Sequence, residues 1–291
     1  MVWFLFTILL KSLYFIFTFV LLILLSIAYP RIIQNPKLPK FISSFSFSLF
    51  YVINICILFY LFEFSFMATT VINAIYLISA QFLGFKLRII GLSGQICSGK
   101  TTAAEYLHLK HDATIIDYTE ILTNILKRPD VRVIIKKDFG DSLFKNIKTL
   151  EYNEEEFKKF IHSNNINKIG YIINKYVIQD ILLRVLQEKI YFNTKYVILE
   201  NTFLMRNSFL KYICFPVLSI CTDQIGHAPV IRRVMNKYNC DREEAMSVYL
   251  ANQPGLMEYK VLSDFIIYND QDIDKLKENL ENFVVTNLKN Y

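Results

Sequence analysis

Residues 86–109 have the sequence KLRIIGLSGQICSGKTTAAEYLHL, which combines three patterns in a fixed order. The apolar residues 86–92 are typical of a short buried strand. Residues 94–101, GQICSGKT, match the pattern G-x-x-x-x-G-K-[ST], and residues 102–109 favour a helix. A phosphate-binding loop requires this context of strand, glycine-rich loop and helix. The sequence therefore predicts a site for the phosphates of a nucleoside triphosphate.

The chemistry of this loop indicates ATP and Mg²⁺ as the cofactors. Two glycines let the backbone curl so that consecutive amides can point at phosphate oxygens, and the following helix adds the positive end of its dipole. Lys100 supplies a positive charge to the β- and γ-phosphates, and the Thr101 hydroxyl is a ligand for Mg²⁺. The residues expected to contact the nucleotide are Gly94, Gln95, Ile96, Cys97, Ser98, Gly99, Lys100, Thr101 and Thr102. The alternative is a glycine-rich turn that binds no nucleotide.

The rest of residues 86–291 alternates between apolar strand patterns and helical stretches, which predicts one α/β domain. Such alternation favours a parallel sheet with helices on both faces, as in P-loop NTPases. The further strands are expected at Ala113–Asp117, Tyr196–Glu200, Phe215–Cys221 and Phe265–Tyr268.

Two of these predicted strands end in an acidic residue, Asp117 and Glu200. Ligands of a parallel sheet bind at the carboxyl ends of its strands, so both side chains are expected near the phosphate loop. An acid there can hold Mg²⁺ or accept a proton from an attacking hydroxyl. We predict that Glu200 binds the metal together with Thr101 and that Asp117 acts on the acceptor hydroxyl. The alternative for both acids is a solvated loop position.

A basic cluster lies further along the chain, at Arg232, Arg233 and Lys237. Such a cluster is suited to closing over phosphates, and we predict catalytic roles for Arg233 and Lys237. The alternative is a solvated helix face. Asp241 follows, with Glu244 three residues later, which predicts the start of another helix.

Residues 1–85 differ sharply in composition, because they contain only five charged residues. Apolar segments at about 2–29, 42–62 and 64–83 predict two or three transmembrane helices that anchor the domain in a lipid bilayer. A cleaved signal peptide is the rival interpretation of residues 1–29, but the segment lacks a basic start and a small-x-small cleavage site. Because the domain needs ATP, it is expected to face the cytosol, from the endoplasmic reticulum or the mitochondrial outer membrane.

Charge and cysteine usage exclude other classes of function. Residues 86–291 carry 28 basic and 25 acidic residues, and the small excess forms no basic stripe, so no nucleic-acid partner is expected. The five cysteines are scattered and form no metal-binding pattern with the histidines, which is typical of reduced thiols. The sequence indicates no particular protein partner.

Residues 86–285 resemble the dephospho-coenzyme A kinase family. The resemblance rests on stretches in the family's order: IIGLSGQICSGKTTAAEYL, ATIID, YVILENTFL, IRRVMNKYNCDREEAMSVYLANQ and SDFIIYND. It implies transfer of the γ-phosphoryl group of ATP to the 3′-hydroxyl of dephospho-coenzyme A, the final step of coenzyme A synthesis. It also implies that Asn269, in the last stretch, lies near the adenine.

The sequence also departs from the family's pattern. Thr119 stands where the family has a second aspartate, the family's His-Pro pair is absent around residues 174–176, and the position of the lid arginine is occupied at best by Lys237. A lysine keeps the charge but loses the forked donors that can hold two phosphate oxygens. Two alternatives therefore stay open: a membrane-tethered pseudokinase that binds nucleotide, and a kinase with a different nucleotide-like acceptor.

Overall fold

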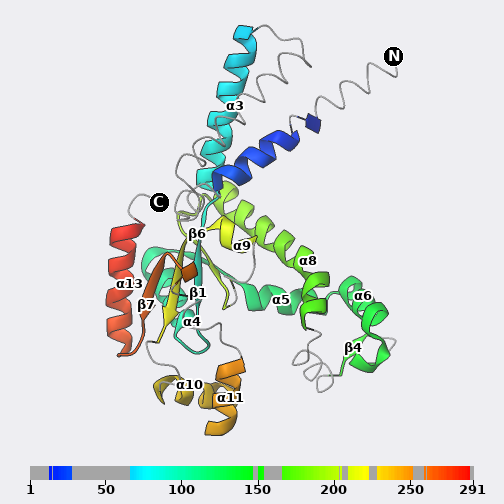
Figure 1. Ribbon diagram of the computed structural model, residues 1–291, viewed down its shortest axis with the longest axis vertical. Coiled ribbons are helices and arrows are strands. Elements are labelled where there is room, and N and C mark those ends of the chain that lie inside the picture. The colour runs from blue at the N-terminus through cyan, green and yellow to red at the C-terminus, as the bar shows by residue number, and fades with distance from the viewer. Residues whose placement is uncertain are drawn as a thin grey trace.

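The computed structural model describes residues 13–14, 16–27, 66–146, 150–153, 166–202, 204, 209–222, 228–251, 259 and 261–288. Its centre is a parallel sheet with the order β2-β5-β1-β6-β7 (Figure 1). The strands are β1 (Ile89–Gly94), β2 (Thr114–Asp117), β5 (Val197–Glu200), β6 (Cys214–Cys221) and β7 (Phe265–Tyr268). All four pairings are parallel, which confirms the predicted sheet and places β1, with its loop, in the middle.

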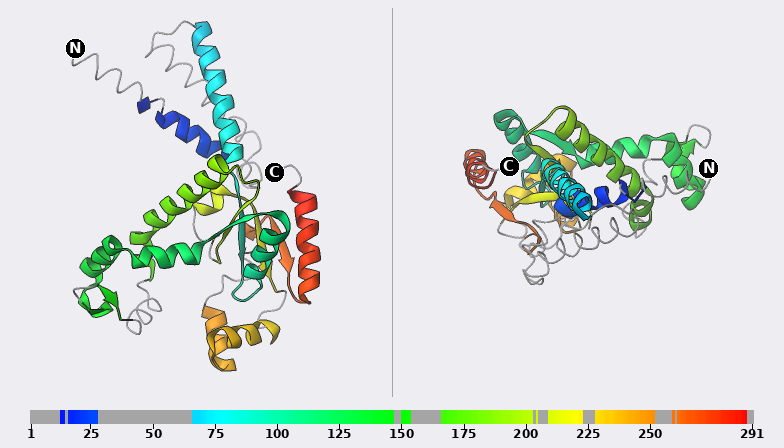
Figure 2. Two further views of the ribbon diagram at one scale, coloured as in Figure 1. Left: turned by 180° about the vertical axis from the view of Figure 1, so that it is seen from behind. Right: turned by 90° about the horizontal axis from the view of Figure 1, so that it is seen from above.

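Apolar residues on both faces of the strands explain why helices cover the sheet on both sides. On one face, Ile90, Leu92 and Leu218 pack against α4 (Lys100–His111) and α13 (Ile273–Asn287). On α4 the contact is made by small residues, Ala103 and Ala104, which let this helix lie close to the sheet. Figure 2 shows α13 on the outer side of this face.

The other face carries the larger core. Ile89, Val197 and Val217 pack there with α5 and α8. The helix α5 shows the expected amphipathic spacing, because its fully buried residues Ile121 and Ile125 lie four positions apart. The elements on this side are α5 (Tyr118–Lys127), α6 (Pro129–Phe139), η1 (Asp141–Leu143), β3 (Phe144–Asn146), β4 (Glu151–Tyr152), α8 (Ile166–Leu186), η2 (Gln187–Tyr191) and α9 (Leu210–Ile213).

Two helices, α10 (Ala228–Tyr238) and α11 (Arg242–Ala251), lie beyond the end of the sheet where the phosphate loop lies (Figure 1). They form a separate small core around Val230, Val234 and Tyr249. The predicted start of α11 is confirmed, because the Glu244 amide donates to Asp241 Oδ1 at 2.8 Å.

The N-terminal helices lie at the opposite end of the sheet (Figure 1). Residues 16–27 are helical, and α3 (Phe66–Lys86) leads into β1 through two residues. The first helix is fastened to the domain, because Ile27 belongs to the core around Ile89, and Arg88 Nη2 donates to the Ser26 carbonyl at 3.1 Å.

The predicted transmembrane helices are not supported by the part of the chain that the structure describes. The segment 42–62 lies outside the described residues, and the segment 2–29 is described as helix only in its second half. Among the described helices, none is both long enough and apolar enough to cross a membrane.

Candidate functional site

The loop after β1 has the backbone shape that its two glycines permit. Gly94 has φ of 141° and Gly99 has φ of 102°, which lie in the region that residues with a Cβ rarely adopt. A side chain at Gly94 would also collide with the Ile220 carbonyl on β6, and a Cβ at Gly99 would lie 2.6 Å from Asn269 Nδ2. Sequence and structure therefore agree that the loop curls tightly between β1 and α4.

Two buried amide side chains hold the loop from behind. Gln95 Oε1 accepts hydrogen bonds from the Thr222 amide at 2.8 Å and the Thr222 hydroxyl at 2.9 Å. Asn269 Nδ2 donates to the Ser98 carbonyl at 2.7 Å. Both side chains thus fix the loop to the ends of β6 and β7 and do not line the cavity beside it. The adenine contact of Asn269 stays a prediction.

Lys100 folds back over the loop. Its Nζ donates to the carbonyls of Gln95 at 2.6 Å and Gly94 at 3.1 Å. Burial lowers the pKa of Lys100 to about 8, although the nearby carboxylate of Glu200 acts in the opposite direction. The protein thus keeps a poorly solvated positive charge beside the loop amides, where an incoming phosphate would find it.

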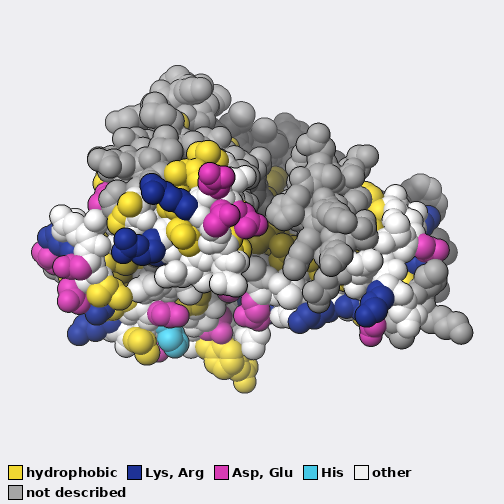
Figure 3. Space-filling model, turned by 90° about the horizontal axis from the view of Figure 1, so that it is seen from below, with side chains coloured by type: hydrophobic (Ala, Val, Ile, Leu, Met, Phe, Trp, Pro, Cys, Tyr) yellow, Lys and Arg dark blue, Asp and Glu magenta, His cyan; other side chains and the backbone are white. Residues whose placement is uncertain are grey.

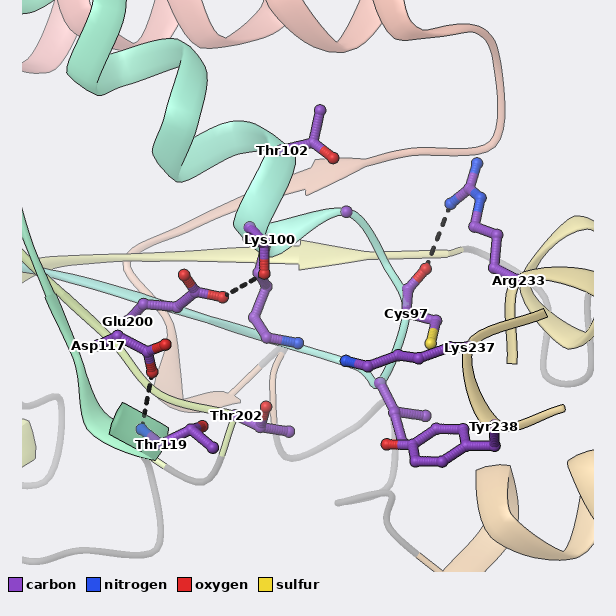
Figure 4. Close-up of a pocket in the computed structure, with 13 residues that line it drawn as sticks. Cys97, Lys100, Thr102, Asp117, Thr119, Glu200, Thr202, Arg233, Lys237 and Tyr238 are labelled. Atoms are coloured by element: carbon purple, nitrogen blue, oxygen red, sulfur yellow. Dashed lines mark hydrogen bonds between the residues drawn. The ribbon is translucent and has the colours of Figure 1, made fainter. Parts of the chain in front are cut away.

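A cavity of about 520 Å³ opens between the loop, the ends of β2 and β5, and α10 (Figure 4). It brings together predicted residues from four separate parts of the sequence. Its lining consists of Ile96, Cys97, Gly99, Lys100, Thr101, Thr102, Asp117, Thr119, Glu200, Thr202, Arg233, Lys237 and Tyr238.

The two predicted acids are direct neighbours in the sheet, because Asp117 pairs with Glu200 in the register of β2 and β5. Thr101 Oγ1 donates to Glu200 Oε1 at 2.9 Å, and Asp117 Oδ1 accepts from the Thr119 amide at 2.7 Å, which caps α5. Burial raises the pKa of Glu200, whereas the Thr101 hydrogen bond and the charge of Lys100 lower it.

The donors around Thr101 and Glu200 fit Mg²⁺, because a hydroxyl and a carboxylate are hard oxygen ligands. The described residues contain no cluster of three or more His, Cys, Asp or Glu that could hold a metal alone. Mg²⁺ does not require such a cluster, since it keeps several waters and binds substrate phosphates with one or two carboxylates.

The basic cluster contributes two side chains to the cavity. Arg233 Nη1 donates to the Cys97 carbonyl at 3.3 Å, and Lys237 lies across from Lys100 in Figure 4. The α10 core also includes Ile96 and Cys97 of the loop, so α10 packs directly on the phosphate loop. Arg232 is exposed and does not line the cavity.

Three lining residues were not predicted as site residues: Thr119, Thr202 and Tyr238. Each lies one or two positions after a predicted residue. The two threonines follow the acids at the strand ends, where the chain turns across the sheet edge. The sequence signal that could have identified these three residues is their position directly after a predicted site residue.

Figure 3 views the molecule from the end where α10 and α11 lie. Lysine, arginine, aspartate and glutamate side chains are intermingled on this face.

Comparison with known proteins identifies the family. The sequence model of the dephospho-CoA kinase family matches residues 88–275. Dephospho-CoA kinase from Fusobacterium nucleatum is 25% identical over 200 residues, which cover 69% of this chain and 98% of that protein. The enzyme of the same name from Clostridium perfringens is 27% identical over 199 residues, which cover 67% of this chain and 95% of that protein.

The fold has a solved counterpart. The crystal structure of TT1252 from Thermus thermophilus aligns with a TM-score of 0.54 and 18% identity, over 68% of this chain and 96% of that one. Together with the family match over 88–275, which includes the loop, both acids and the basic cluster, the comparisons settle the identity of the domain. The chain belongs to the dephospho-CoA kinase family, a family of phosphotransferases.

Proposed function

We propose that this chain transfers the γ-phosphoryl group of ATP to the 3′-hydroxyl of dephospho-CoA. The observation that carries the proposal is the cavity in which Lys100 and Thr101 of the phosphate loop face Asp117, Glu200 and the basic residues of α10. A phosphoryl donor and an acceptor hydroxyl need these groups within one enclosed space.

In the proposed reaction, the acceptor oxygen forms a bond to the γ-phosphorus while the bond between that phosphorus and the β–γ bridging oxygen breaks, and ADP leaves. Asp117 orients the hydroxyl and accepts its proton. Lys100 moves from the loop carbonyls to the β- and γ-phosphates. Arg233 and Lys237 stabilise negative charge on the transferring group from the α10 side.

Thr101 and Glu200 are the residues that would hold Mg²⁺. The ion supplies neutralisation of phosphate charge. For this role Glu200 must be ionised. Burial raises the pKa of Glu200, and the hydrogen bond from Thr101 together with the nearby charge of Lys100 acts in the opposite direction.

We also propose that residues 1–85 attach the kinase domain, residues 86–291, to a lipid bilayer of the endoplasmic reticulum or the mitochondrial outer membrane, with the domain in the cytosol. Support comes from exposed apolar side chains along one side of α3, spaced three and four positions apart: Val71, Ile75, Ile78, Phe82 and Phe85. The helix at 16–27 adds exposed Ile16, Phe17, Val20 and Leu24. Apolar surfaces of this extent mark contact sites for lipid or protein.

A second candidate is nucleotide binding without transfer. One observation favours it: the Asp117 carboxylate already caps α5 through the Thr119 amide. If that hydrogen bond persists in the complex, one carboxylate oxygen is withdrawn from the acceptor, and the cavity binds ATP as a structural ligand.

Steady-state kinetics of the full chain with Mg-ATP and dephospho-CoA decide between the two. We expect turnover that disappears in Lys100→Met and persists in the matched control Lys110→Met, an exposed lysine on the same helix. Phosphorylation of another nucleotide-like acceptor but not of dephospho-CoA would replace the proposed substrate. ATP binding without turnover of any acceptor would favour the second candidate.

A further inference from the structure

A second cavity lies at the end of the sheet opposite to the phosphate loop, where α3 enters β1. It has a volume of about 380 Å³ and is lined by Phe85, Lys86, Lys189, Asn193, Thr194 and Lys195. Three of these six side chains are lysines. The lining residues come from the end of α3 and from the segment that contains η2. The proposed reaction uses none of them.

Lys189 is the buried member of the group, with 5% of its surface exposed. Its Nζ donates to the Lys195 carbonyl at 2.7 Å, which holds the ammonium group at the cavity wall. Burial, with a further contribution from the positive charge of Lys86, lowers the pKa of Lys189 to about 8. An anion in the cavity would relieve both effects, because it replaces lost solvation and offsets the repulsion between the lysines.

Among the described residues, no acidic side chain belongs to the lining of this cavity. The carboxylate of Glu188 is turned toward Thr114 and Thr194, whose hydroxyls donate to Glu188 Oε2 at 3.1 and 2.7 Å, and Glu188 does not line the cavity. The C-terminal end of α3 contributes about half a negative charge by its dipole. The three positive charges of Lys86, Lys189 and Lys195 exceed this partial negative charge.

The two segments that line the cavity also expose apolar side chains. Phe82 and Phe85 of α3 are exposed, and Ile190, Tyr191 and Phe192 are exposed beside Lys189, with Tyr191 80% and Phe192 56% accessible. The two aromatic rings pack edge to face with centroids 4.9 Å apart. Aromatic side chains next to lysines are typical of the boundary between lipid tails and headgroups.

We propose that this cavity binds a phosphate group, and that the source of the phosphate is the headgroup of an anionic phospholipid. The three lysines supply the charge, the side-chain amide of Asn193 supplies a further donor, and the exposed apolar side chains of α3 and of residues 190–192 contact the acyl chains. The phosphate site is independent of the kinase reaction, whereas the lipid source rests on the proposed membrane attachment. Lipid bound here holds the N-terminal end of β1 at the bilayer and leaves the kinase site at the far end of the sheet.

The test uses the full chain in neutral detergent micelles, with dissociation constants measured by microscale thermophoresis. The probes are dioctanoyl phosphatidic acid, dioctanoyl phosphatidylcholine and inorganic phosphate. We expect the phosphatidic acid to bind more tightly than the phosphatidylcholine. The double variant Lys86→Gln/Lys195→Gln should weaken the affinity for phosphatidic acid about 25-fold, from about fivefold for each lysine.

Two further pairs of substitutions test whether the loss of affinity is specific to this cavity. The control Lys127→Gln/Lys137→Gln removes the same charge from exposed positions on α5 and α6 and should leave the affinity unchanged. Lys86→Arg/Lys195→Arg keeps the charge and should retain binding. If the double glutamine variant fails to fold, the single variants Lys86→Gln and Lys195→Gln should each weaken the affinity about fivefold, and unchanged affinity in both would overturn the site. Turnover of dephospho-CoA should be equal in all variants, which separates this site from the kinase site.

Equal affinity of the native chain and the Lys86→Gln/Lys195→Gln variant for phosphatidic acid would overturn the proposed site. Lysine-dependent binding of inorganic phosphate, without tighter binding of phosphatidic acid than of phosphatidylcholine, would overturn the lipid as its source.

Discussion

Replacement of Lys100 by methionine should stabilise the nucleotide-free protein while it removes ATP binding. Burial lowers the pKa of Lys100 from the usual value of 10.5 to about 8. One pKa unit corresponds to about 1.4 kcal/mol, so at pH 7 the charged side chain lowers the free energy of unfolding by about 3 kcal/mol. Methionine has a similar shape and no charge.

The substitution also removes two hydrogen bonds, to the carbonyls of Gly94 and Gln95. The Gln95 carbonyl keeps the Ser98 amide as a donor at 3.3 Å, so the loss is about 1–2 kcal/mol. The net effect of Lys100→Met at pH 7 is therefore an increase in the free energy of unfolding of about 1–2 kcal/mol.

The pH dependence makes this prediction specific. The folded-state pKa lies below the unfolded-state pKa, so between pH 8 and 10.5 the unfolded chain binds more protons at Lys100, and native stability rises with pH. Lys100→Met has no titrating group at this position, so its free energy of unfolding lacks this increase with pH. Urea unfolding of both proteins is followed by circular dichroism at pH 7 and pH 10. The difference in the free energy of unfolding should move against Lys100→Met by about 2–3 kcal/mol, so that the variant becomes the less stable protein at pH 10. A variant less stable than the native chain at pH 7, with a difference independent of pH, would show that burial of the Lys100 charge does not destabilise the native protein.

Further outcomes follow from the site. Asp117→Asn should lower turnover by about 100-fold or more and leave the ATP dissociation constant nearly unchanged; a large loss of ATP affinity in a nucleotide titration would instead place Asp117 on the metal. Thr101→Val should raise the Mg²⁺ concentration needed for half-maximal turnover, with recovery in Thr101→Ser, and equal Mg²⁺ dependence in all three proteins would remove Thr101 from the metal site. The affinity for ATP should fall up to about tenfold per pH unit above pH 8, where Lys100 loses its proton, and a flat profile to pH 9.5 in calorimetry would contradict that role. Gly94→Ala should lower the free energy of unfolding by about 1–3 kcal/mol because of its positive φ and the Ile220 carbonyl; unchanged urea unfolding would contradict the assigned backbone strain.

The sequence predicted the parts of the site that depend on local pattern or on a general rule of topology. The phosphate loop is contiguous, so its glycines, Lys100 and Thr101 were recognisable directly. Asp117 and Glu200 lie 83 positions apart, yet both end apolar strands, and the carboxyl ends of parallel strands meet at one edge. Their pairing in the sheet confirms that argument.

Other features depend on contacts between distant residues and could not be read from the pattern. Gln95 lies inside the loop motif, but its side chain turns to Thr222 behind the loop, which is a property of where β6 ends. Asn269 similarly fixes the Ser98 carbonyl. Tyr238 reaches the cavity because α10 packs on Ile96 and Cys97, and a lid position of that kind follows from packing.

We propose above that the acceptor of this phosphotransferase is dephospho-CoA. A single-turnover experiment tests it most directly: excess full chain is mixed with γ-³²P-labelled ATP, Mg²⁺ and dephospho-CoA, and the nucleotide products are separated and weighed by mass spectrometry. We expect label on coenzyme A with the new phosphate on the 3′-hydroxyl, and no label on coenzyme A with Lys100→Met. ATP that binds fully to the native chain and stays unreacted beside dephospho-CoA would contradict the claim.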